Sequence, residues 1–388
     1  MQSYKRVILG LVIFFYTAHA AADRLRPLNI LFIVDYFPSR SQTFILNIIT
    51  GLIDHGHNVS IFSFHKDSSV DMHPNIEKYK LLERVIYGQF PEQLPQCDIV
   101  FCQFGYLGKR IVKIPPLKEW LNDKKVVVCF RGSDLTAHIK DDPTMYKKLF
   151  KKGDLFLPVC DYFKKRLIML GCEPRKIVVH HSAINCSQFC FKKRKKPEEG
   201  PIHLVSVCRL VEKKGIDIAI QAVAKVMRKY KNIHFTIVGD GPERAYLEKL
   251  IKNLKVTDNV TMYGWGAQDQ VVDILKRSHI FLLPSLTSSD GNEEGIANAL
   301  KESMAMGLVS VGTWHAGTPE LIEDGVSGFL VPEGNCIELA KTIEYIIEHP
   351  DIWEPIGMAA RKKVEEEFET KQSIKKLEHL FYTLLMHE

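Results

Sequence analysis

The chain has 388 residues, of which 46% are hydrophobic and 25% are charged, and its formal net charge is +6. This composition excludes a disordered chain, a collagen-like repeat and a small disulfide scaffold, while the length allows two or three domains. No apolar run after residue 23 approaches the roughly 20 residues that span a bilayer, so a multi-span membrane protein is excluded as well.

The charge is unevenly divided along the chain. Residues 1–196 hold 31 Lys+Arg against 17 Asp+Glu, a balance of +14, whereas residues 197–388 hold 21 against 29, a balance of −8. Such asymmetry predicts that the two halves face different partners. A nucleic acid, an anionic membrane surface or a phosphorylated substrate each fits the basic half.

The first 22 residues have the pattern of a secretory signal. Lys5 and Arg6 precede an apolar stretch, 7–17, which is followed by Ala18-His19-Ala20-Ala21. An uncleaved membrane anchor fits the same pattern. The nine cysteines, an odd number without any Cys-x-x-Cys pair, instead favour a reduced compartment. We therefore expect a cytoplasmic protein peripheral to the membrane, with export through the signal-like start as the alternative.

Short apolar runs alternate with helical patterns along the whole chain. Runs of this kind are typical of strands buried on both faces of a parallel sheet. The expected strands of the first half are Ile30–Val34, Val59–Phe64, Ile99–Phe104, Val126–Phe130, Leu155–Val159 and Ile177–Val179. Those of the second half are Leu204–Val207, Phe235–Val238, Val260–Tyr263, Ile280–Leu283, Val309–Val311 and Phe329–Val331. Expected helices include Ile216–Lys229, Arg244–Leu254 and Ile296–Met306.

This alternation predicts an α/β fold of two doubly wound domains. The expected boundaries are 28–190 for the N-terminal domain and 202–370 for the C-terminal domain. Residues 191–201 are charged and contain Pro and Gly, so we expect a solvated linker there. Residues 371–388 are expected to form a C-terminal helix that could pack back on the N-terminal domain. A ligand would bind between the sheets, at the carboxyl ends of the strands.

One candidate motif is the segment 290–302, which follows an expected strand. Glu294 and Glu302 are spaced so that both carboxylates could share one face of a helix. Gly295 allows close approach of a ligand, and the free N–H groups of residues 295–298 can hold an anion. In isolation the two glutamates would suit a solvated helix face equally well.

Two further motifs lie at strand-to-helix turns. Arg209 leaves a buried strand and Lys214 is expected to start the next helix, so the two cations could neutralise a diphosphate. A surface salt-bridge cluster is the alternative. The segment Val238-Gly239-Asp240-Gly241-Pro242 forms a tight turn but lacks the third glycine of the dinucleotide fingerprint. An NAD or ATP enzyme is therefore disfavoured.

Together these motifs resemble those of a retaining glycosyltransferase of family 4, which has the GT-B fold of two Rossmann-like domains facing across a cleft. The resemblance covers residues 28–388 and extends to the segments Gly317-Thr318-Pro319-Glu320 and Gly328-Phe329-Leu330-Val331-Pro332. Within the family the chain is most similar to the exopolysaccharide and colanic-acid type, through the segments 41–45 and 180–185.

The resemblance implies a role for each candidate residue. Arg209, Lys214 and Glu294 would form the catalytic group, with the two cations on the diphosphate and Glu294 on the hydroxyls of the donor sugar. Glu302 would bind the nucleotide ribose. The remaining donor-binding positions would be Asp240, Gly241, Gly264 and Trp265 near the base, and Gly295, Ile296, Ala297 and Asn298 at the phosphate and sugar. Trp265 has a core packing role as its alternative. The donor would be a UDP- or GDP-linked sugar, with no metal or other cofactor.

The acceptor side departs from the family pattern. Family members often have His where this chain has Arg131 and Gln103, and Glu where it has Gln42. Ser41 and Asp134 complete the candidate acceptor side. Neither Arg131 nor Gln103 can take a proton as His would. Arg131 would bind an acceptor phosphate, or else form a structural ion pair with Asp134.

We therefore expect a transferase that moves a sugar to a glycan or a lipid-linked acceptor in cell-surface polysaccharide biosynthesis. Basic positions between residues 147 and 166 suggest contact with an anionic membrane surface. No nucleic-acid partner is expected. The alternatives are a sugar-nucleotide epimerase of the same fold, and an exported or degenerate sugar-binding protein without catalysis.

Overall fold

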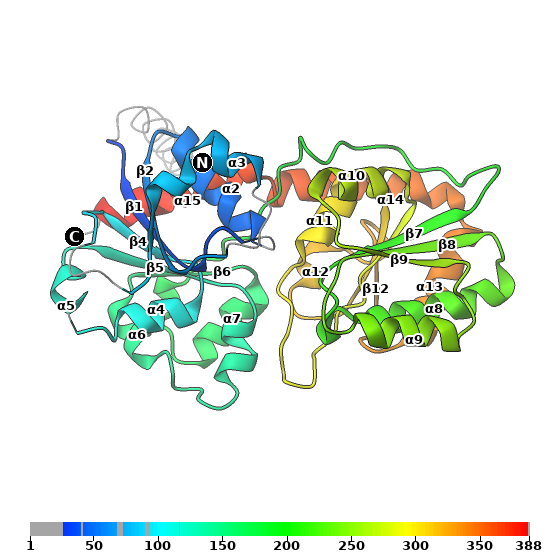
Figure 1. Ribbon diagram of the computed structural model, residues 1–388, viewed down its shortest axis with the longest axis horizontal. Coiled ribbons are helices and arrows are strands. Elements are labelled where there is room, and N and C mark those ends of the chain that lie inside the picture. Colours follow the sequence, from blue (N-terminus) through cyan, green and yellow to red (C-terminus); the bar gives the residue numbers. More distant parts are fainter. Residues whose placement is uncertain (1–25, 40–41, 68–72, 90–93, 116, 387–388) are drawn as a thin grey trace, which may run out of the picture.

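The computed structural model describes residues 26–39, 42–67, 73–89, 94–115 and 117–386. The signal-like segment 1–22 and Ser41 lie outside these described residues. Within them, two six-stranded parallel sheets follow one another along the chain, and Figure 1 shows them as the two halves of the molecule. The predicted α/β class with two doubly wound sheets is confirmed.

The N-terminal sheet has the strand order β3-β2-β1-β4-β5-β6. Its strands are β1 (Asn29–Tyr36), β2 (Asn58–His65), β3 (Val85–Tyr87), β4 (Ile99–Cys102), β5 (Lys125–Phe130) and β6 (Leu155–Pro158). Its helices are α2 (Thr43–Asp54), α3 (Pro74–Lys78), α4 (Gly105–Ile111), α5 (Leu117–Trp120), α6 (Lys147–Lys152) and α7 (Asp161–Met169). Every residue of the central strand β4 is buried, which explains why its sequence shows no polar alternation.

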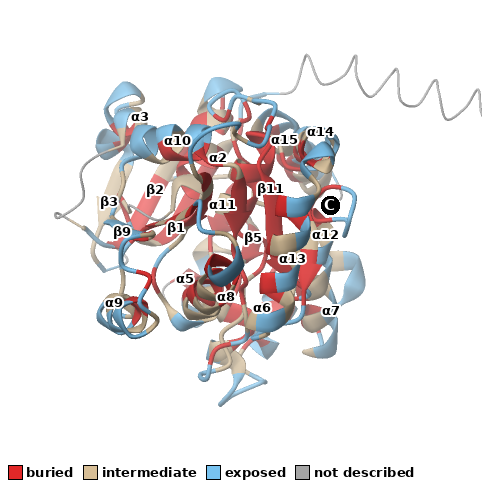
Figure 2. Cartoon of the chain, turned by 90° about the vertical axis from the view of Figure 1, so that its right-hand side faces the viewer, coloured by how far each residue is buried: buried red, intermediate tan, exposed pale blue. Residues whose placement is uncertain are grey.

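The C-terminal sheet has the strand order β12-β11-β10-β7-β8-β9. Its strands are β7 (Ile202–Val207), β8 (Ile233–Val238), β9 (Val260–Gly264), β10 (Ile280–Leu282), β11 (Val309–Thr313) and β12 (Phe329–Val331). Its helices are α8 (Ile216–Lys229), α9 (Arg244–Asn253), α10 (Gln268–Arg277), α11 (Asn298–Ala305), α12 (Thr318–Leu321), α13 (Cys336–Glu348) and α14 (Trp353–Glu367). The buried side chains of α8 recur every three or four residues, so one face of this helix packs on the sheet. In Figure 2 the sheets form the buried interior and exposed residues cover the outer faces of the helices.

Two strand predictions need correction. The expected strand Ile177–Val179 is a single bridge between Phe156 and Ile177, because the chain leaves the edge of the sheet directly after this pairing. Conversely, β3 was not expected, since its three residues are only partly buried and form no long apolar run. Both differences lie at sheet edges, where pairing on one side alone leaves a weak hydrophobic pattern.

The segment 191–201 has no regular secondary structure, but it is not solvated throughout as predicted. Arg194 is buried at 3% exposure. Its guanidinium donates hydrogen bonds to the carbonyl oxygens of Leu275, Lys276 and Met306, at 3.3, 2.7 and 3.0 Å. These carbonyls lie at the C-terminal ends of α10 and α11, where a cation is favoured. The segment is therefore anchored to the C-terminal domain.

The last helix, α15 (Thr370–Met386), returns to the N-terminal half of the molecule, as Figure 1 shows in red. Its buried face consists of Ile374, Leu377 and Phe381 and joins the core around β1 and α2. On the same helix, the Glu378 carboxylate contacts the His57 ring at 2.9 Å. This helix therefore ties the C-terminal end of the chain to the first sheet.

Candidate active site

The first part of the site is the turn between β7 and α8. Arg209 is exposed just beyond the end of β7. Contrary to the prediction, Lys214 does not start the next helix. It lies in a 3-10 turn, Glu212–Lys214, and α8 begins only at Ile216. Gly215 between them has φ +60°, and a Cβ there would lie 2.1 Å from the Pro284 carbonyl oxygen. This close approach requires glycine and presses the turn against the segment that follows β10.

Glu294 lies in the loop between β10 and α11, next to this turn. The Lys214 ammonium donates a hydrogen bond to its carboxylate, and the Lys213 ammonium lies 3.9 Å from the same oxygen. The helix predicted from Ile296 starts only at Asn298, so Glu294 and Glu302 do not share a helix face. The two carboxylates still belong to one continuous segment, because the loop runs directly into α11.

His315 and Glu333 fix the position of Glu294. The backbone N–H of Glu294 donates to Nε2 of His315 at 3.0 Å, and Nδ1 of the same ring contacts the Glu333 carboxylate at 2.8 Å. A backbone N–H can only donate, so Nε2 is the acceptor and Nδ1 carries the proton that it donates to Glu333. This arrangement holds the loop that carries Glu294 at a fixed distance from Lys214.

The electrostatics of the two glutamates differ. Burial by itself would raise the pKa of Glu294, but the Lys214 and then the Lys213 ammonium lower it to about 2. Burial raises the pKa of Glu302 to about 7, against an opposing effect of Lys301. Glu294 is therefore a permanent anion at neutral pH, whereas Glu302 is poised between its two protonation states.

A set of free backbone donors lies between these two glutamates. Among the described residues, the N–H groups of Gly295, Ile296, Ala297 and Asn298 have no hydrogen-bond acceptor. They come at the start of α11, where the helix dipole favours negative charge. The Glu302 carboxylate likewise has no hydrogen-bond donor within the described part of the chain. This arrangement can bind a group that is anionic at one end and carries hydroxyls at the other.

The residues expected near a base lie at the ends of β8 and β9. The Asp240 carboxylate accepts the N–H of Gly241 at 2.8 Å and lies 3.7 Å from Arg244. The N–H of Gly239 donates to the Gly264 carbonyl at 2.7 Å, which joins the two turns. Trp265 follows directly and is 50% exposed, so its core packing alternative is wrong.

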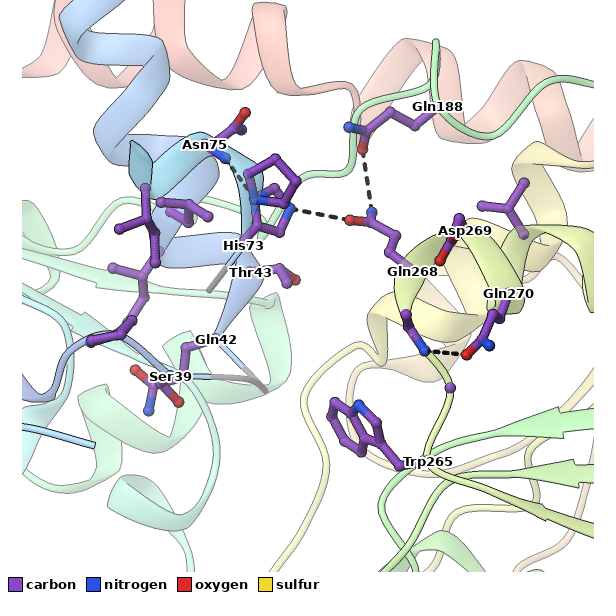
Figure 3. Close-up of a pocket in the computed structure, with 18 of the residues that line it drawn as sticks. Ser39, Gln42, Thr43, His73, Asn75, Gln188, Trp265, Gln268, Asp269 and Gln270 are labelled. Carbon is purple, nitrogen blue, oxygen red and sulfur yellow. Dashed lines mark hydrogen bonds between the residues drawn. The ribbon is translucent and has the colours of Figure 1, made fainter. Parts of the chain in front are cut away.

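A groove of about 960 Å³ separates Trp265 from the N-terminal domain. Figure 3 shows Trp265 and Gln268 on one wall and Gln42 and His73 on the other. The Gln268 side chain bridges the walls, through His73 at 3.2 Å and Gln188 at 3.3 Å. Arg209, Lys214 and Glu294 are not among the residues that line this groove. Among its described lining residues there is no Lys or Arg.

The predicted acceptor-side residues are brought together, but not as an Arg131–Asp134 ion pair. Asp134 is fully buried and its carboxylate accepts the backbone N–H groups of Gly105, Arg131 and Gly132, at 2.8 to 3.0 Å. The Arg131 guanidinium instead donates to both oxygens of Gln103 and to the Ser182 hydroxyl, at 2.8 to 3.2 Å. The ion-pair alternative is wrong because backbone donors already occupy the carboxylate.

The two domains meet directly beside Glu294. The Glu293 carboxylate accepts hydrogen bonds from Arg166 at 2.7 Å and from the Tyr162 hydroxyl at 3.0 Å. Glu320 accepts the first two N–H groups of α7, those of Asp161 and Tyr162, at 2.8 and 2.9 Å. These contacts place the acceptor-side residues against the loop that carries Glu294.

Sequence reasoning did not single out Lys213, His315, Glu333 or Lys301. Lys213 was hidden in the run Glu212-Lys213-Lys214, where only one lysine matched a family position. His315 and Glu333 follow β11 and β12, so their position at the carboxyl ends of predicted strands was the available signal. Lys301 lies in an otherwise apolar helix face, and a charge there is itself unusual.

Similarity to known proteins identifies the family of the chain. The family model described as glycosyl transferases group 1 matches residues 188–363. The putative colanic acid biosynthesis glycosyltransferase WcaL of Salmonella typhimurium is 31% identical, over 90% of this chain and 98% of that protein. The amylovoran biosynthesis glycosyltransferase AmsK of Erwinia amylovora is 33% identical, over 88% of this chain and 96% of that protein.

Solved structures share the fold. The structure of Anabaena HepE in complex with UDP and glucose has a TM-score of 0.75 at 16% identity and covers 92% of this chain and 100% of its own. Sucrose-phosphate synthase from Thermosynechococcus elongatus also has a TM-score of 0.75, at 15% identity, and covers 94% of this chain. The fold is therefore GT-B, as predicted, and the chain belongs to the group 1 glycosyl transferases.

Proposed function

We propose that this glycosyltransferase moves a sugar, with retained anomeric configuration, from a UDP- or GDP-linked donor to a glycan or lipid-linked acceptor in cell-surface polysaccharide biosynthesis. The observation that carries the proposal is the charged cluster of Arg209, Lys214 and Glu294 beside the free N–H groups of residues 295–298. The names of the relatives WcaL and AmsK, which refer to colanic acid and amylovoran, support the polysaccharide assignment.

The donor would bind across the C-terminal domain in this proposal. Arg209 and Lys214 would offset the negative charge that develops on the departing diphosphate. Glu294, which is ionised, would accept hydrogen bonds from the hydroxyls of the donor sugar, and Glu302 would accept those of the ribose. Because Arg209 and Lys214 supply the positive charge at the diphosphate, we propose that transfer needs no metal ion.

The groove beside Trp265 is suited to the acceptor glycan. Its walls present amide side chains, which both donate and accept hydrogen bonds, together with the exposed aromatic ring of Tyr36. Sugars offer hydroxyls and apolar ring faces, which match these two kinds of group. Because no Lys or Arg is among the described residues that line the groove, uncharged sugars fit it best.

A membrane surface is a further proposed partner. Lys147, Lys148, Lys151 and Lys152 are exposed on α6, in the proposed acceptor domain. Clustered lysines attract anionic lipid headgroups. Within the described residues, no helix is both long and apolar enough to cross a bilayer. Flotation with vesicles should show binding that rises with the content of anionic lipid, and binding independent of that content would contradict this partner.

Product analysis tests the proposed activity. Purified protein is incubated with UDP- and GDP-sugars, with and without oligosaccharide or lipid-linked acceptors, and with EDTA. We expect acceptor-dependent transfer, unaffected by EDTA, whose product keeps the anomeric configuration of the donor by NMR. Conversion of the donor without acceptor would indicate an epimerase, and glycan binding that is insensitive to nucleotide would indicate a sugar-binding protein.

A further inference from the structure

Arg131 is a cation without a carboxylate partner at the centre of the interdomain contact. Its guanidinium donates to the Gln103 carbonyl at 3.2 Å, to the Gln103 side-chain oxygen at 2.8 Å and to the Ser182 hydroxyl at 2.8 Å. All three acceptors are neutral. Among the described residues no carboxylate oxygen lies within ion-pair distance of this guanidinium. The charge of this partly buried cation is therefore only partly compensated, because the Asp134 carboxylate favours the charged form from beyond ion-pair distance.

Hydrogen-bond donors accumulate around this charge. An arginine has five N–H donors, and the contacts above use three of them, so two are left. Gln103 is completely buried, and its side-chain Nε2 has no hydrogen-bond partner within the described structure. Since the guanidinium can only donate, the Gln103 oxygen must face it, which fixes Nε2 on the other side of the same amide group. The unused groups are therefore all donors.

A second cationic side chain, Lys301, contacts the same Ser182 through the backbone carbonyl. The Lys301 ammonium donates to the Ser182 carbonyl at 2.6 Å and to the Asn298 side chain at 3.0 Å, and Lys301 is completely buried. Burial lowers the pKa of Lys301 to about 7, although Glu302 opposes the effect. An anion placed beside Arg131 would relieve the electrostatic cost of both cations.

The position of Arg131 relates it to the donor loop. A Cβ on Gly295 would lie 3.2 Å from the Arg131 carbonyl oxygen, and one on Gly132 would lie 3.3 Å from the Glu293 carbonyl oxygen. The ring of Phe44 lies 4.4 Å from the guanidinium carbon and holds the plane of the group. Arg131 is thus fixed next to the segment that would hold the donor sugar.

We propose that Arg131, supported by Gln103, recognises a carboxylate or phosphate carried by one of the substrates, at the point where donor sugar and acceptor meet. The anion would come either from a uronic acid as the transferred sugar or from a charged group on the acceptor. The diphosphate of the donor already has Arg209 and Lys214. This inference rests on the proposed glycosyl transfer and specifies its substrate class.

Binding to matched pairs of probes tests the proposal and separates the two sources. For the donor arm, UDP-glucuronic acid is compared with UDP-glucose, or GDP-mannuronic acid with GDP-mannose if GDP is the nucleotide that binds. For the acceptor arm, geranyl diphosphate is compared with geraniol, and a glucuronic-acid-terminated disaccharide with its glucose-terminated counterpart, both with nucleotide present. Each pair is titrated into wild type, Arg131→Gln and Arg131→Lys.

We expect the anionic member of at least one pair to bind wild type at least tenfold more tightly than its neutral partner. Arg131→Gln should abolish this preference, and Arg131→Lys should retain part of it, while affinity for UDP or GDP alone stays within twofold. If Arg131→Gln does not fold, Gln103→Met, which removes both the unpaired Nε2 donor and the oxygen that orients Arg131 at nearly constant volume, should reduce the preference at least threefold.

Two results overturn the proposal: no anionic preference in wild type in any pair, or a preference that the variants leave unchanged. Both leave the proposed function standing if UDP or GDP binds and Lys214→Met loses that binding. Failure of wild type to bind either nucleotide would instead contradict the proposed function itself.

Discussion

Lys214 donates a hydrogen bond to Glu294, a residue 80 positions later in the chain, and so joins the turn after β7 to the loop before α11. Both side chains are largely buried, at 13% and 17% exposure. The contact brings together one positive and one negative group that the proposed chemistry uses separately, on the diphosphate and on the sugar. It is the structural basis of the proposed donor site.

Removing one member of this pair should be worse than removing both. Glu294→Gln leaves Lys214 without its counter-charge, and Lys214→Met leaves Glu294 with only the more distant Lys213, so each should reduce the free energy of unfolding by about 1–3 kcal/mol. The double variant should recover part of this stability but no transferase activity. Urea unfolding and product assays measure the two effects. As a control, Lys341→Met removes an exposed pair with Glu338 and should change stability by less than about 0.5 kcal/mol.

The two glutamates should respond to pH in opposite directions. The pKa of Glu302 is raised from 4.5 to about 7, so stability associated with its protonated form is present at low pH and is lost as pH rises through 7. Glu302→Gln should therefore melt above wild type by a margin that grows between pH 5 and 8, while nucleotide affinity falls. A constant margin across this range would contradict the burial argument.

The pKa of Glu294 is shifted in the opposite direction, so its effect on stability has the opposite pH dependence. Its pKa is lowered from 4.5 to about 2, so its stabilising effect is present above pH 4.5 and is lost as pH falls through 2. The melting temperature of Glu294→Gln should lie below that of wild type at pH 7, and the two should converge on acidification. Melting curves between pH 3 and 7 measure this, and parallel curves would contradict the Lys214 ion pair.

Trp265 should contribute to nucleotide binding through the base. Stacking of a base on an aromatic ring contributes about 1–3 kcal/mol, so Trp265→Ala should weaken UDP or GDP binding about five- to 100-fold. The affinity of the Trp265→Ala variant for inorganic pyrophosphate should stay unchanged, because Arg209 and Lys214 are intact in this variant. Tyr345→Ala, at a 45% exposed aromatic on α13, is the matched control. Equal loss of pyrophosphate binding would show that Trp265 acts through folding instead.

The buried arginine of the interdomain segment should matter for stability alone. Arg194→Met removes three hydrogen bonds to carbonyl oxygens at helix ends and should lower the free energy of unfolding by about 1–3 kcal/mol. Nucleotide affinity of the folded variant should equal that of wild type. Chemical denaturation and nucleotide titration check both expectations, and a wild-type unfolding midpoint would show that the segment is solvated after all.

The sequence alone predicted the strands that form the centre of each sheet, because strands buried on both faces keep uninterrupted apolar runs. The resemblance to a known family placed Arg209, Lys214 and Glu294 in one site, and the structure brings Lys214 into contact with Glu294 beyond the carboxyl ends of two parallel strands. Sequence reasoning failed for side chains whose burial and partners depend on tertiary contacts. The burial of Arg194 depends on the ends of two distant helices, and Asp134 pairs with backbone N–H groups that no spacing rule reveals. The role of His315 depends on a single backbone contact with Glu294.

Calorimetric titration of UDP and GDP tests the central claim, that the turn carrying Lys214 and the loop carrying Glu294 form a nucleotide-sugar site. Wild type, Lys214→Met and the control Lys341→Met are compared at a temperature where all three are folded by circular dichroism. We predict that one nucleotide binds wild type and the control equally, and Lys214→Met at least tenfold more weakly. Equal binding to all three proteins, or no binding of either nucleotide to wild type, would contradict the account.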